Sequence, residues 1–392
     1  MTTDASTLPL IEIRGGPRER GRQHGEAARE QIHRAIAFYE QLYARSAKLS
    51  QAEVRERAPM WVPIIEEYAG RDILEEVEGI AEGAEVPFAD ILALNGRGEL
   101  SYGNPFLDES HAGCSSFALT AEATGDGHVY CGQNWDWRAG AKDTVIMLRI
   151  VQPPKPTIIM QTEAGQIGRQ GANSAGLALN ANGLGGRFPG TRLGVPSPYV
   201  RRRVLDSVDM HDALHAIFTS SQTYCGNVLL THRDGVVIDL ETTPGRHGWL
   251  YPHDGMLVHA NHFQAFVPEQ IADSYRPFSP DSLYRTVRIE QVLRNATNAA
   301  DSAAVRDVIA TAMRDHFGVP NSVCNHPDPR RHPLEQNQTV ASSTVDLTTG
   351  EYRVVAGLPC ESKYTKLPWN LYERDEDATE VPTSNGRLAE VR

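Results

Sequence analysis

The 392-residue sequence has no uninterrupted apolar run of the roughly 18 residues that a membrane-spanning helix needs. Its first residues also lack the basic and then apolar pattern of a secretory signal. Positive charge is in deficit: 38 lysines and arginines stand against 50 aspartates and glutamates, whereas nucleic acids and anionic membranes select basic surfaces. We therefore expect a cytoplasmic protein that binds neither nucleic acid nor membrane.

Cysteine is scarce, and an odd number of widely spaced cysteines without an export signal is typical of free thiols. The five are Cys114, Cys131, Cys225, Cys324 and Cys360. There is no CxxC or HExxH pattern. His259 and His262, with His253 nearby, are a poor ligand set because side chains three positions apart on a strand face opposite sides. The sequence thus predicts no metal site, and no cofactor.

The pattern of apolar residues changes near residue 113. Before it, apolar residues recur at helical spacing, as in Ile73, Val77 and Ile80, which predicts helices with one core-facing side. From Cys114 onward, short β-branched and aromatic segments alternate with glycine, proline and asparagine, which predicts strands. Helical stretches at 283–293 and 303–313 interrupt them. This order favours an α+β fold of helix-covered sheets, with a mobile acidic tail after Tyr372.

Residues 113–117 (GCSSF) place Cys114 at the start of a predicted strand, directly after Gly113. Such a cysteine is more often a packed small hydrophobic residue than a functional one. The next predicted strand, however, carries residues 132–136 (GQNWD). Antiparallel pairing would bring Asn134 and Asp136 close to Cys114, and a nucleophile needs a carboxylate and amide nearby. A plain strand end with a turn explains these residues equally well.

A third polar segment is residues 258–263 (VHANHF), where a short apolar strand ends in hydrogen-bonding residues. Asn261 is a candidate donor to an oxyanion, and His262 a candidate supporting residue. Structural capping alone would also explain an asparagine at this position.

A cysteine gains reactivity when it becomes N-terminal. A thiol with a pKa of about 8.5 is only a few per cent ionised at neutral pH, so it needs a base. An α-amino group with a pKa near 8 lies on the same residue once the preceding bond is cut. Gly113 lacks a Cβ, which would let the peptide adopt a strained conformation open to attack by the thiol.

Taken in order, these segments resemble the isopenicillin N acyltransferase-like family of N-terminal nucleophile (Ntn) hydrolases. The resemblance extends over nearly residues 11 to 360. It includes residues 15–21 and 24–25 (GGPRERG and HG), 79–84 (GIAEGA), 94–95 and 102–103 (LN and YG), 162–165 and 167–168 (TEAG and IG), and 173–176 (NSAG).

The resemblance implies a four-layer αββα sandwich, self-cleaved at Gly113–Cys114 into an α-chain (1–113) and a β-chain (114–392) that together form one structural domain. It implies Cys114 as the nucleophile, with its own amino group as base. Asp136 would orient that amino group, and Asn261 would bind the oxyanion. Ser116, Asn134, Trp135 and His262 are candidates for substrate binding or support.

One departure from the family concerns an arginine near the end of the last hairpin, which aligns with Leu358. Its role is either lost or moved, with Arg353 and Lys363 as candidate replacements. The departure concerns the part of the site that would bind the acyl acceptor or a carboxylate, and it leaves the nucleophile unaffected.

The leading hypothesis is an amidohydrolase that cleaves small-molecule N-acyl amides through a thioester on Cys114. An acyltransferase that passes the acyl group to an amine shares the chemistry up to that thioester. A non-catalytic binding protein on the same scaffold is a third alternative. The sequence leaves open whether the chain forms a homo-oligomer.

Overall fold

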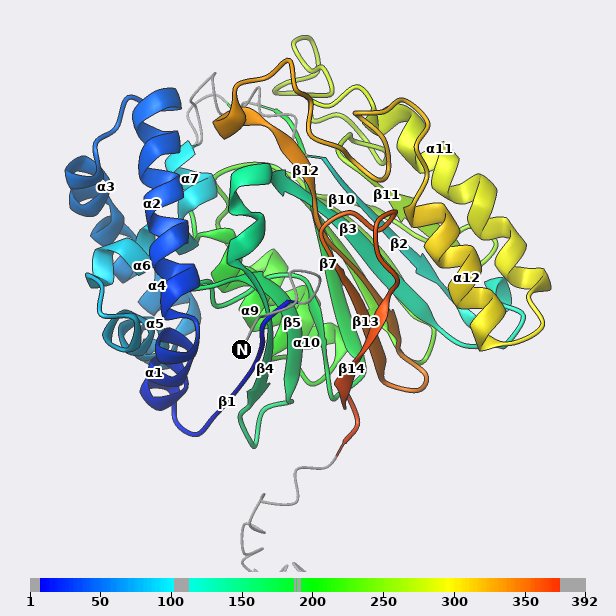
Figure 1. The fold of residues 1–392 in the computed structure, drawn as a ribbon, viewed down its shortest axis with the longest axis horizontal. Coiled ribbons are helices and arrows are strands. Elements are labelled where there is room, and N and C mark those ends of the chain that lie inside the picture. The colour runs from blue at the N-terminus through cyan, green and yellow to red at the C-terminus, as the bar shows by residue number, and fades with distance from the viewer. Residues whose placement is uncertain (1–7, 102–112, 187, 189–191, 374–392) are drawn as a thin grey trace, which may run out of the picture.

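The protein forms four layers, with two β-sheets packed face to face between helices (Figure 1). The computed structural model describes residues 8–101, 113–186, 188 and 192–373. The acidic tail predicted to be mobile lies almost entirely outside these residues. The αββα sandwich expected from the sequence is confirmed.

The first sheet has eight strands. In spatial order they are β1 (Leu10–Arg14), β4 (Val145–Val151), β5 (Ile158–Glu163), β6 (Gly171–Asn173), β7 (Leu177–Gly183), β8 (Gly226–His232), β9 (Val237–Thr242) and β10 (Gly248–Leu250). The edge strand β1 runs parallel to β4, whereas the other neighbours in this sheet are antiparallel.

The second sheet has six strands, and every neighbouring pair is antiparallel. In spatial order they are β11 (Met256–His259), β2 (Cys114–Leu119), β3 (Tyr130–Arg138), β12 (Asn337–Asp346), β13 (Glu351–Ala356) and β14 (Thr365–Asn370). Cys114 therefore begins an interior strand of this sheet.

Helices cover the outer face of each sheet (Figure 1). Those before Cys114 are α1 (Pro17–Ala27), α2 (Arg29–Ser46), α3 (Gln51–Arg57), α4 (Val62–Ala69), α5 (Arg71–Ala84), α6 (Phe88–Asn95) and α7 (Arg97–Ser101). Together with α9 (Ser197–Leu205) and α10 (Met210–Phe218), they lie on the side of the first sheet. The second sheet is covered by α11 (Ser282–Leu293) and α12 (Ser302–Met313).

The buried apolar side chains form separate layers that correspond to this architecture. One cluster joins the early helices to the first sheet and includes Ile80 and Leu148. Met147 and Val345 belong to a cluster between the two sheets. A third cluster packs α11 and α12 on β2, β3 and β11. Burial of apolar area on both faces of each sheet is the dominant stabilising contribution in such a sandwich.

Two of the glycine-containing motifs in the early part of the chain have a structural explanation. Helices α1 and α5 approach so closely that a Cβ on Gly21 would lie 2.0 Å from the carbonyl oxygen of Glu76. A Cβ on Gly79 would lie 2.2 Å from the carbonyl oxygen of Arg18. Gly25 and Gly83 are equally crowded. Only glycine permits this contact, so these motifs fix helix packing.

The histidine of the first motif is also structural. His24 is buried in α1, and its Nε2 accepts a hydrogen bond from the backbone N–H of Gly165 at 3.1 Å. Burial lowers the pKa of His24 to about 4, so the ring is neutral and can accept this bond. The contact joins two motifs that are distant in sequence.

Among the described residues before Gly113, the prediction of helices is correct except in the first element. Residues 10–14 form β1, which joins the first sheet beside β4. Five residues (LIEIR) are too few for periodicity to separate strand from helix, and the strand forms because its partner supplies the hydrogen bonds. The helix α10 and the short strands β6, β10 and β14 were also not predicted.

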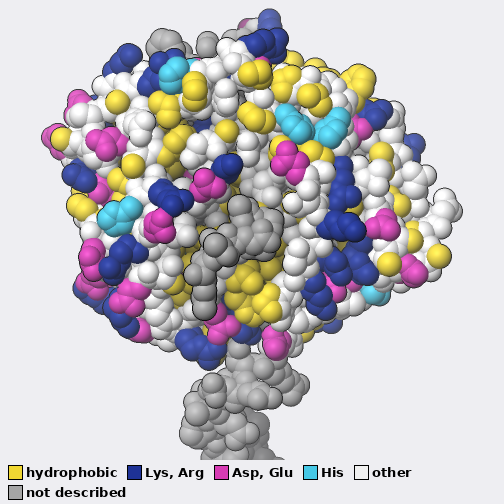
Figure 2. All heavy atoms as spheres, viewed as in Figure 1, with side chains coloured by type: hydrophobic (Ala, Val, Ile, Leu, Met, Phe, Trp, Pro, Cys, Tyr) yellow, Lys and Arg dark blue, Asp and Glu magenta, His cyan; other side chains and the backbone are white. Residues whose placement is uncertain are grey.

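The surface carries charges of both signs. On the face in Figure 2, basic and acidic side chains are interspersed over the described part of the chain. Among the described residues, no helix combines the length and the apolar character needed to cross a membrane.

Candidate active site

Strands β2 and β3 bring two of the predicted segments together. Their antiparallel register pairs Cys114 with Trp135 and Ser115 with Asn134. Asp136, one residue beyond Trp135, therefore lies beside the start of β2. The third segment arrives on the other side, because β11 pairs with β2 and ends with His259 opposite Ser116.

Cys114 is buried, and both its backbone and its thiol have polar neighbours. Its backbone N–H donates to Oδ1 of Asn261 at 2.8 Å. Its Sγ lies 3.8 Å from the carbonyl oxygen of Asp136. Burial, with a smaller effect of the Asp136 carboxylate, raises the pKa of the Cys114 thiol above its usual value. With residue 113 still attached, the thiol is therefore held in its protonated form.

Asn261 is oriented by its hydrogen bonds. Its Oδ1 accepts from the Cys114 backbone N–H and also from Nη2 of Arg285, at 2.7 Å. Two donors on one oxygen fix the orientation of the amide. Its Nδ2 then donates to the carbonyl oxygen of Gly183 at 2.9 Å, which leaves a second N–H on that nitrogen for another acceptor.

Arg285, on α11, makes hydrogen bonds to Cys114, Ser115 and Asn261. Its role was not identified from the sequence. Its side chain is fully buried, and Nη1 donates to the Cys114 carbonyl oxygen and to Ser115 Oγ, both at 2.7 Å. Its Nε donates to Asp281 at 2.6 Å. It lies 171 residues after Cys114, in an amphipathic helix where an arginine gives no signal of a buried role.

Gly113 lies where a side chain has no space. A Cβ at this position would lie 2.7 Å from Nη2 of Arg285 and 3.3 Å from Oδ1 of Asn261. The absence of a Cβ matters because it lets the guanidinium of Arg285 reach the peptide.

Asp136 is buried, and one of its two carboxyl oxygens has a hydrogen-bond partner among the described residues. Its Oδ1 accepts a hydrogen bond from Thr339 Oγ1 at 2.6 Å. Its Oδ2 is buried and has no hydrogen-bond partner among the described residues. Burial raises the pKa of Asp136 well above its usual value, although Arg285 and Thr339 oppose this. A cationic group beside Oδ2 would restore the carboxylate.

The residues predicted to support the site occupy different positions. The hydroxyl of Ser116 accepts from Nδ2 of Asn182 at 2.8 Å and so connects the two sheets. Trp135 is fully buried, with the guanidinium of Arg169 stacked 3.7 Å above its ring. Asn134 donates instead to two carbonyl oxygens of the α12–β12 region, those of Met313 and Val323. It supports the fold and makes no contact with Cys114.

His262 supports Asn261 through a serine. Ser282 Oγ accepts the Asn261 backbone N–H and pairs with His262 Nδ1, both at 2.6 Å. Burial lowers the pKa of His262 to about 4, so its neutral Nδ1 accepts the serine proton. The expectation that His259 and His262 face opposite sides is wrong, because β11 ends at His259 and the two rings stack with centroids 6.3 Å apart.

His259 also has its own partners. It is fully buried, and its Nε2 lies 3.0 Å from Oε1 of Glu241 and 3.6 Å from Oδ2 of Asp239. These carboxylates raise the pKa of His259 against the effect of burial. A protonated imidazole between two acids accounts for this group without a metal ion.

A cavity of about 340 Å³ opens in front of Cys114 and Asp136. Residues 183–186 form part of its wall. The size lies in the range of small-molecule sites. Within the part of the chain that the structure describes, the arginines that line the cavity are Arg97, Arg138, Arg169, Arg201 and Arg276.

Arg97 pairs with Glu163, and Arg138 and Arg276 donate to backbone carbonyl oxygens. In contrast, Arg169 and Arg201 have no hydrogen-bond or ion-pair partner among the described residues. Burial lowers the pKa of both guanidinium groups. Nε of Arg169 is buried without a hydrogen-bond partner in the described structure. Nearby, burial raises the pKa of Glu99 to about 7, and its Oε2 is likewise unpartnered among described residues.

The arginines of the cavity supply the positive charge that Leu358 does not provide. Leu358 is buried, and neither Arg353 nor Lys363 is among the residues that line the cavity. Arg353 pairs with Glu351 at 2.5 Å, and Lys363 is exposed. Positive charge thus reaches the site from elsewhere in the fold. The arginines that supply it come from distant positions in the sequence.

Residues 123–331 match the model of the family described as acyl-coenzyme A:6-aminopenicillanic acid acyl-transferase. The chain is 32% identical over 324 residues to the 40 kDa form of acyl-coenzyme A:6-aminopenicillanic-acid-acyltransferase from Emericella nidulans, covering 80% of this chain and 84% of the relative.

Similar solved structures include penicillin V acylase from Agrobacterium tumefaciens (TM-score 0.40, 14% identity, 62% of this chain and 82% of that chain). A variant of conjugated bile acid hydrolase from Clostridium perfringens has a TM-score of 0.43 and 12% identity, over 68% of this chain and 100% of that chain. On the strength of the family match and the 32% identical relative, the chain belongs to the acyl-coenzyme A:6-aminopenicillanic acid acyl-transferase family of enzymes.

Proposed function

We propose that this enzyme cuts its own chain before Cys114 and then hydrolyses N-acyl amides through a thioester on that residue. The observation that carries the proposal is the position of Cys114 at the start of β2, at the cavity, with its backbone nitrogen held by Asn261. The nitrogen of the bond to be cut is already fixed in place.

The self-cleavage step is an N-to-S acyl shift. The Cys114 sulfur attacks the carbonyl carbon of Gly113, the C–N bond breaks, and the nitrogen takes the thiol proton. Water then hydrolyses the thioester, which leaves a carboxylate on Gly113 and a free thiol and amine on Cys114. The 1–113 and 114–392 segments remain associated as one structural domain, because β1 pairs with β4 across the cleavage site.

The amine formed by cleavage supplies the charge that Asp136 lacks. Its ammonium form would place a cation near the unpartnered Oδ2, which lowers the pKa of Asp136 and orients the amine. In turnover, the neutral amine takes the thiol proton as sulfur attacks the substrate carbonyl, and it returns that proton to the leaving amine. The second N–H of Asn261 Nδ2 stabilises the oxyanion. Water then releases the acyl group.

We further propose that the substrate carries a carboxylate or another anionic group. The support is the pair Arg169 and Arg201, whose guanidinium groups line the cavity without an anion at hydrogen-bond distance among the described residues. A buried cation is costly unless it is paired, so a bound anion would offset that cost.

The test is the mass of the purified protein under denaturing conditions. We expect two fragments, residues 1–113 and 114–392, with the larger one beginning Cys114-Ser115-Ser116. Cys114→Ala should remain full length and inactive, while Cys131→Ala and Cys225→Ala should be cleaved. Wild type that stays uncut after prolonged incubation, or Cys114→Ala that is cut, would contradict the proposal. An uncut and inactive wild type would favour the non-catalytic binding protein.

Acyl transfer to an amine is the second candidate, and the name of the 32% identical relative favours it. Both reactions share the thioester and differ in what attacks it. Incubation of a turning-over N-acyl amide with an added amine separates them. Free acid as the sole product supports hydrolysis, and a new amide whose yield rises with amine concentration supports transfer.

A further inference from the structure

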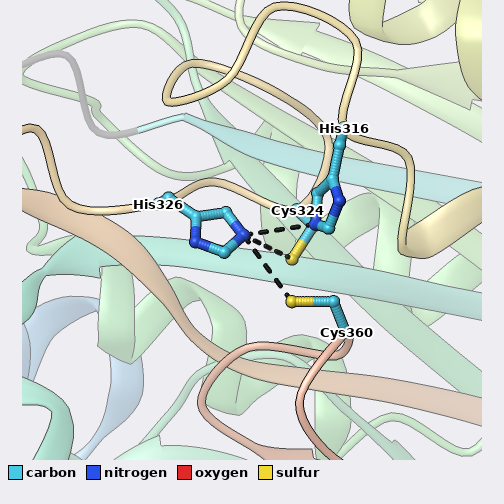
Figure 3. Close-up of side chains that lie close together, drawn as sticks. All are labelled: His316, Cys324, His326 and Cys360. Carbon is cyan, nitrogen blue, oxygen red and sulfur yellow. Dashed lines mark hydrogen bonds between the residues drawn. The ribbon is translucent and has the colours of Figure 1, made fainter.

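Four side chains with metal-binding atoms converge near the surface, outside the site described above (Figure 3). His316, Cys324 and His326 belong to the segment between α12 and β12, and Cys360 follows β13. Their nitrogen and sulfur atoms all lie within 4.8 Å of one another. Two loops that are separate in sequence thus contribute one compact set of two imidazoles and two thiols.

The three distances from Nε2 of His326 match edges of a tetrahedron around zinc. Nε2 of His326 lies 3.2 Å from Nε2 of His316, 3.7 Å from Sγ of Cys324 and 3.6 Å from Sγ of Cys360. Zinc bonds of about 2.0–2.1 Å to nitrogen and 2.3 Å to sulfur give tetrahedral edges of about 3.3 Å for N···N and about 3.6 Å for N···S.

Hydrogen bonding alone cannot satisfy this arrangement. A ring nitrogen carries either one proton or one lone pair, so Nε2 of His326 can make one good hydrogen bond. Three partners nevertheless surround it at contact distance. A cation at the common centre would instead engage all four atoms at once.

We propose that His316, Cys324, His326 and Cys360 form a tetrahedral Cys₂His₂ zinc site. Two thiolates and two imidazoles are a common ligand set of closed, structural zinc sites. The expectation of no metal rested on short spacing patterns such as CxxC, and here 33 residues separate the last two ligands, His326 and Cys360. The site would join the loop before β12 to the loop after β13, and binding would release the two thiol protons.

The site is also connected to Asp136. Asn325 lies between two ligands, and its backbone N–H donates to Thr339 Oγ1 at 3.0 Å. Its carbonyl oxygen accepts the Thr339 backbone N–H at 2.9 Å. Thr339 Oγ1 in turn donates to Asp136 Oδ1. By fixing Asn325, zinc would hold Thr339 against the carboxylate. This positioning role, unlike the zinc site itself, rests on the proposed function.

Binding is tested on the full chain carrying Cys114→Ala, so that the proposed nucleophile cannot contribute a thiolate. The protein is stripped with a chelator and titrated with Zn²⁺ or Co²⁺. We expect one zinc ion per chain retained through dialysis, and Co²⁺ spectra with tetrahedral d–d bands and thiolate charge transfer. Cys360→Ser should weaken the charge-transfer band, and His316→Ala should lose zinc on dialysis.

The controls are His253→Ala, a histidine with 93% of its side chain exposed, and Cys225→Ala, a buried thiol outside the cluster. Both should bind like the parent, and circular dichroism confirms that each variant is folded. Folded parent protein that retains no zinc and gives no charge-transfer band overturns the site. A Cys324–Cys360 disulfide in protein purified under reducing conditions overturns it as well.

The positioning role is tested on wild-type protein. Removing zinc should slow iodoacetamide alkylation of Cys114 as well as turnover, and added Zn²⁺ should restore both. Zinc binding with unchanged alkylation and turnover overturns the positioning role alone. Failure of self-cleavage in zinc-loaded protein would count against the proposed function and not against the zinc site.

Discussion

The backbone nitrogen of Cys114 donates a 2.8 Å hydrogen bond to the side-chain oxygen of Asn261, a residue 147 positions later in the chain. The same oxygen accepts from Arg285, so the nitrogen and the guanidinium share one acceptor. After cleavage the nitrogen would become an amine and could keep this bond. If the chain cleaves itself as proposed, one asparagine would hold the same atom before and after the peptide bond breaks.

Gly113→Ala should slow self-cleavage. The new Cβ would meet the Arg285 guanidinium at 2.7 Å, and that group is anchored by hydrogen bonds to Cys114, Ser115, Asn261 and Asp281. Overpacking of this kind costs about 1–3 kcal/mol, and displacement of Arg285 would disturb the nitrogen to be released. The rate is followed by mass spectrometry after expression at low temperature.

Gly16→Ala is the matched control, since its φ is −69° and a Cβ there meets nothing within 4 Å. It should be cleaved like wild type. Cleavage of Gly113→Ala at the wild-type rate would show that Arg285 can move away from the new Cβ without any effect on cleavage.

Asn261→Ala and Asp136→Ala should fail in different ways. Loss of one oxyanion donor typically costs about 10²–10³ in turnover, so mature Asn261→Ala should turn over that much more slowly. Its Cys114 should still react with iodoacetamide, because the base and Asp136 remain. Asp136→Ala should slow self-cleavage and alkylation together, because the amine loses its orienting carboxylate.

Both variants are compared at equal thermal stability, measured in parallel. Equal loss of every activity in both would point to general destabilisation. Wild-type turnover by Asn261→Ala would exclude it as the oxyanion donor.

The raised pKa of Asp136 predicts a pH-dependent stability of the uncleaved chain. In Cys114→Ala, the folded state keeps Asp136 protonated at pH values where the unfolded chain, with a pKa of about 3.9, has lost that proton. The folded state then binds more protons, so its stability falls as pH rises, by up to about 1.4 kcal/mol per pH unit.

The additional substitution Asp136→Asn in the Cys114→Ala variant should remove this loss of folding stability with rising pH. The free energy of unfolding of the double variant, from urea titrations, should rise relative to Cys114→Ala between about pH 4 and pH 7. A difference that does not change with pH would mean that Asp136 is already ionised in the precursor.

Arg169→Leu and Arg201→Leu should discriminate between charged and neutral substrates. A hydrogen bond to a charged group contributes about 1.5–3 kcal/mol, so KM for a carboxylate-bearing amide should rise about tenfold or more. KM for the corresponding methyl ester should change little. Arg276→Leu, an exposed residue at the same cavity, is the control. Equal effects on acid and ester would argue against carboxylate recognition.

Local patterns were sufficient for much of the fold. Cys114 begins a strand as predicted, and the apolar and β-branched runs Cys114–Leu119 and Val145–Val151 form strands because they have clear ends. Cys114 and Asp136 come together as expected, since successive antiparallel strands pair. Asn261 also reaches Cys114, as the resemblance to the family implied. Whether they have the proposed roles stays a prediction.

What the sequence could not reveal depends on contacts between distant segments. Arg285 and Arg169 look like ordinary helix and loop arginines until the fold buries them. The thiol of Cys360 has no ligand near it in sequence, and only the packing of two loops brings it to His326. Strand β1 likewise exists because β4 supplies its hydrogen bonds.

The parallel ladder between β1 and β4 has a kinetic consequence. Before the bond at Cys114 is cut, β1 and β4 belong to one molecule, and refolding from denaturant is a first-order process. Once the bond is cut, the same ladder forms only when two separate polypeptides meet, so recovery becomes concentration-dependent and slows on dilution. After self-cleavage, an enzyme molecule that unfolds would refold poorly. The lifetime of the mature enzyme would therefore depend on the height of its unfolding barrier.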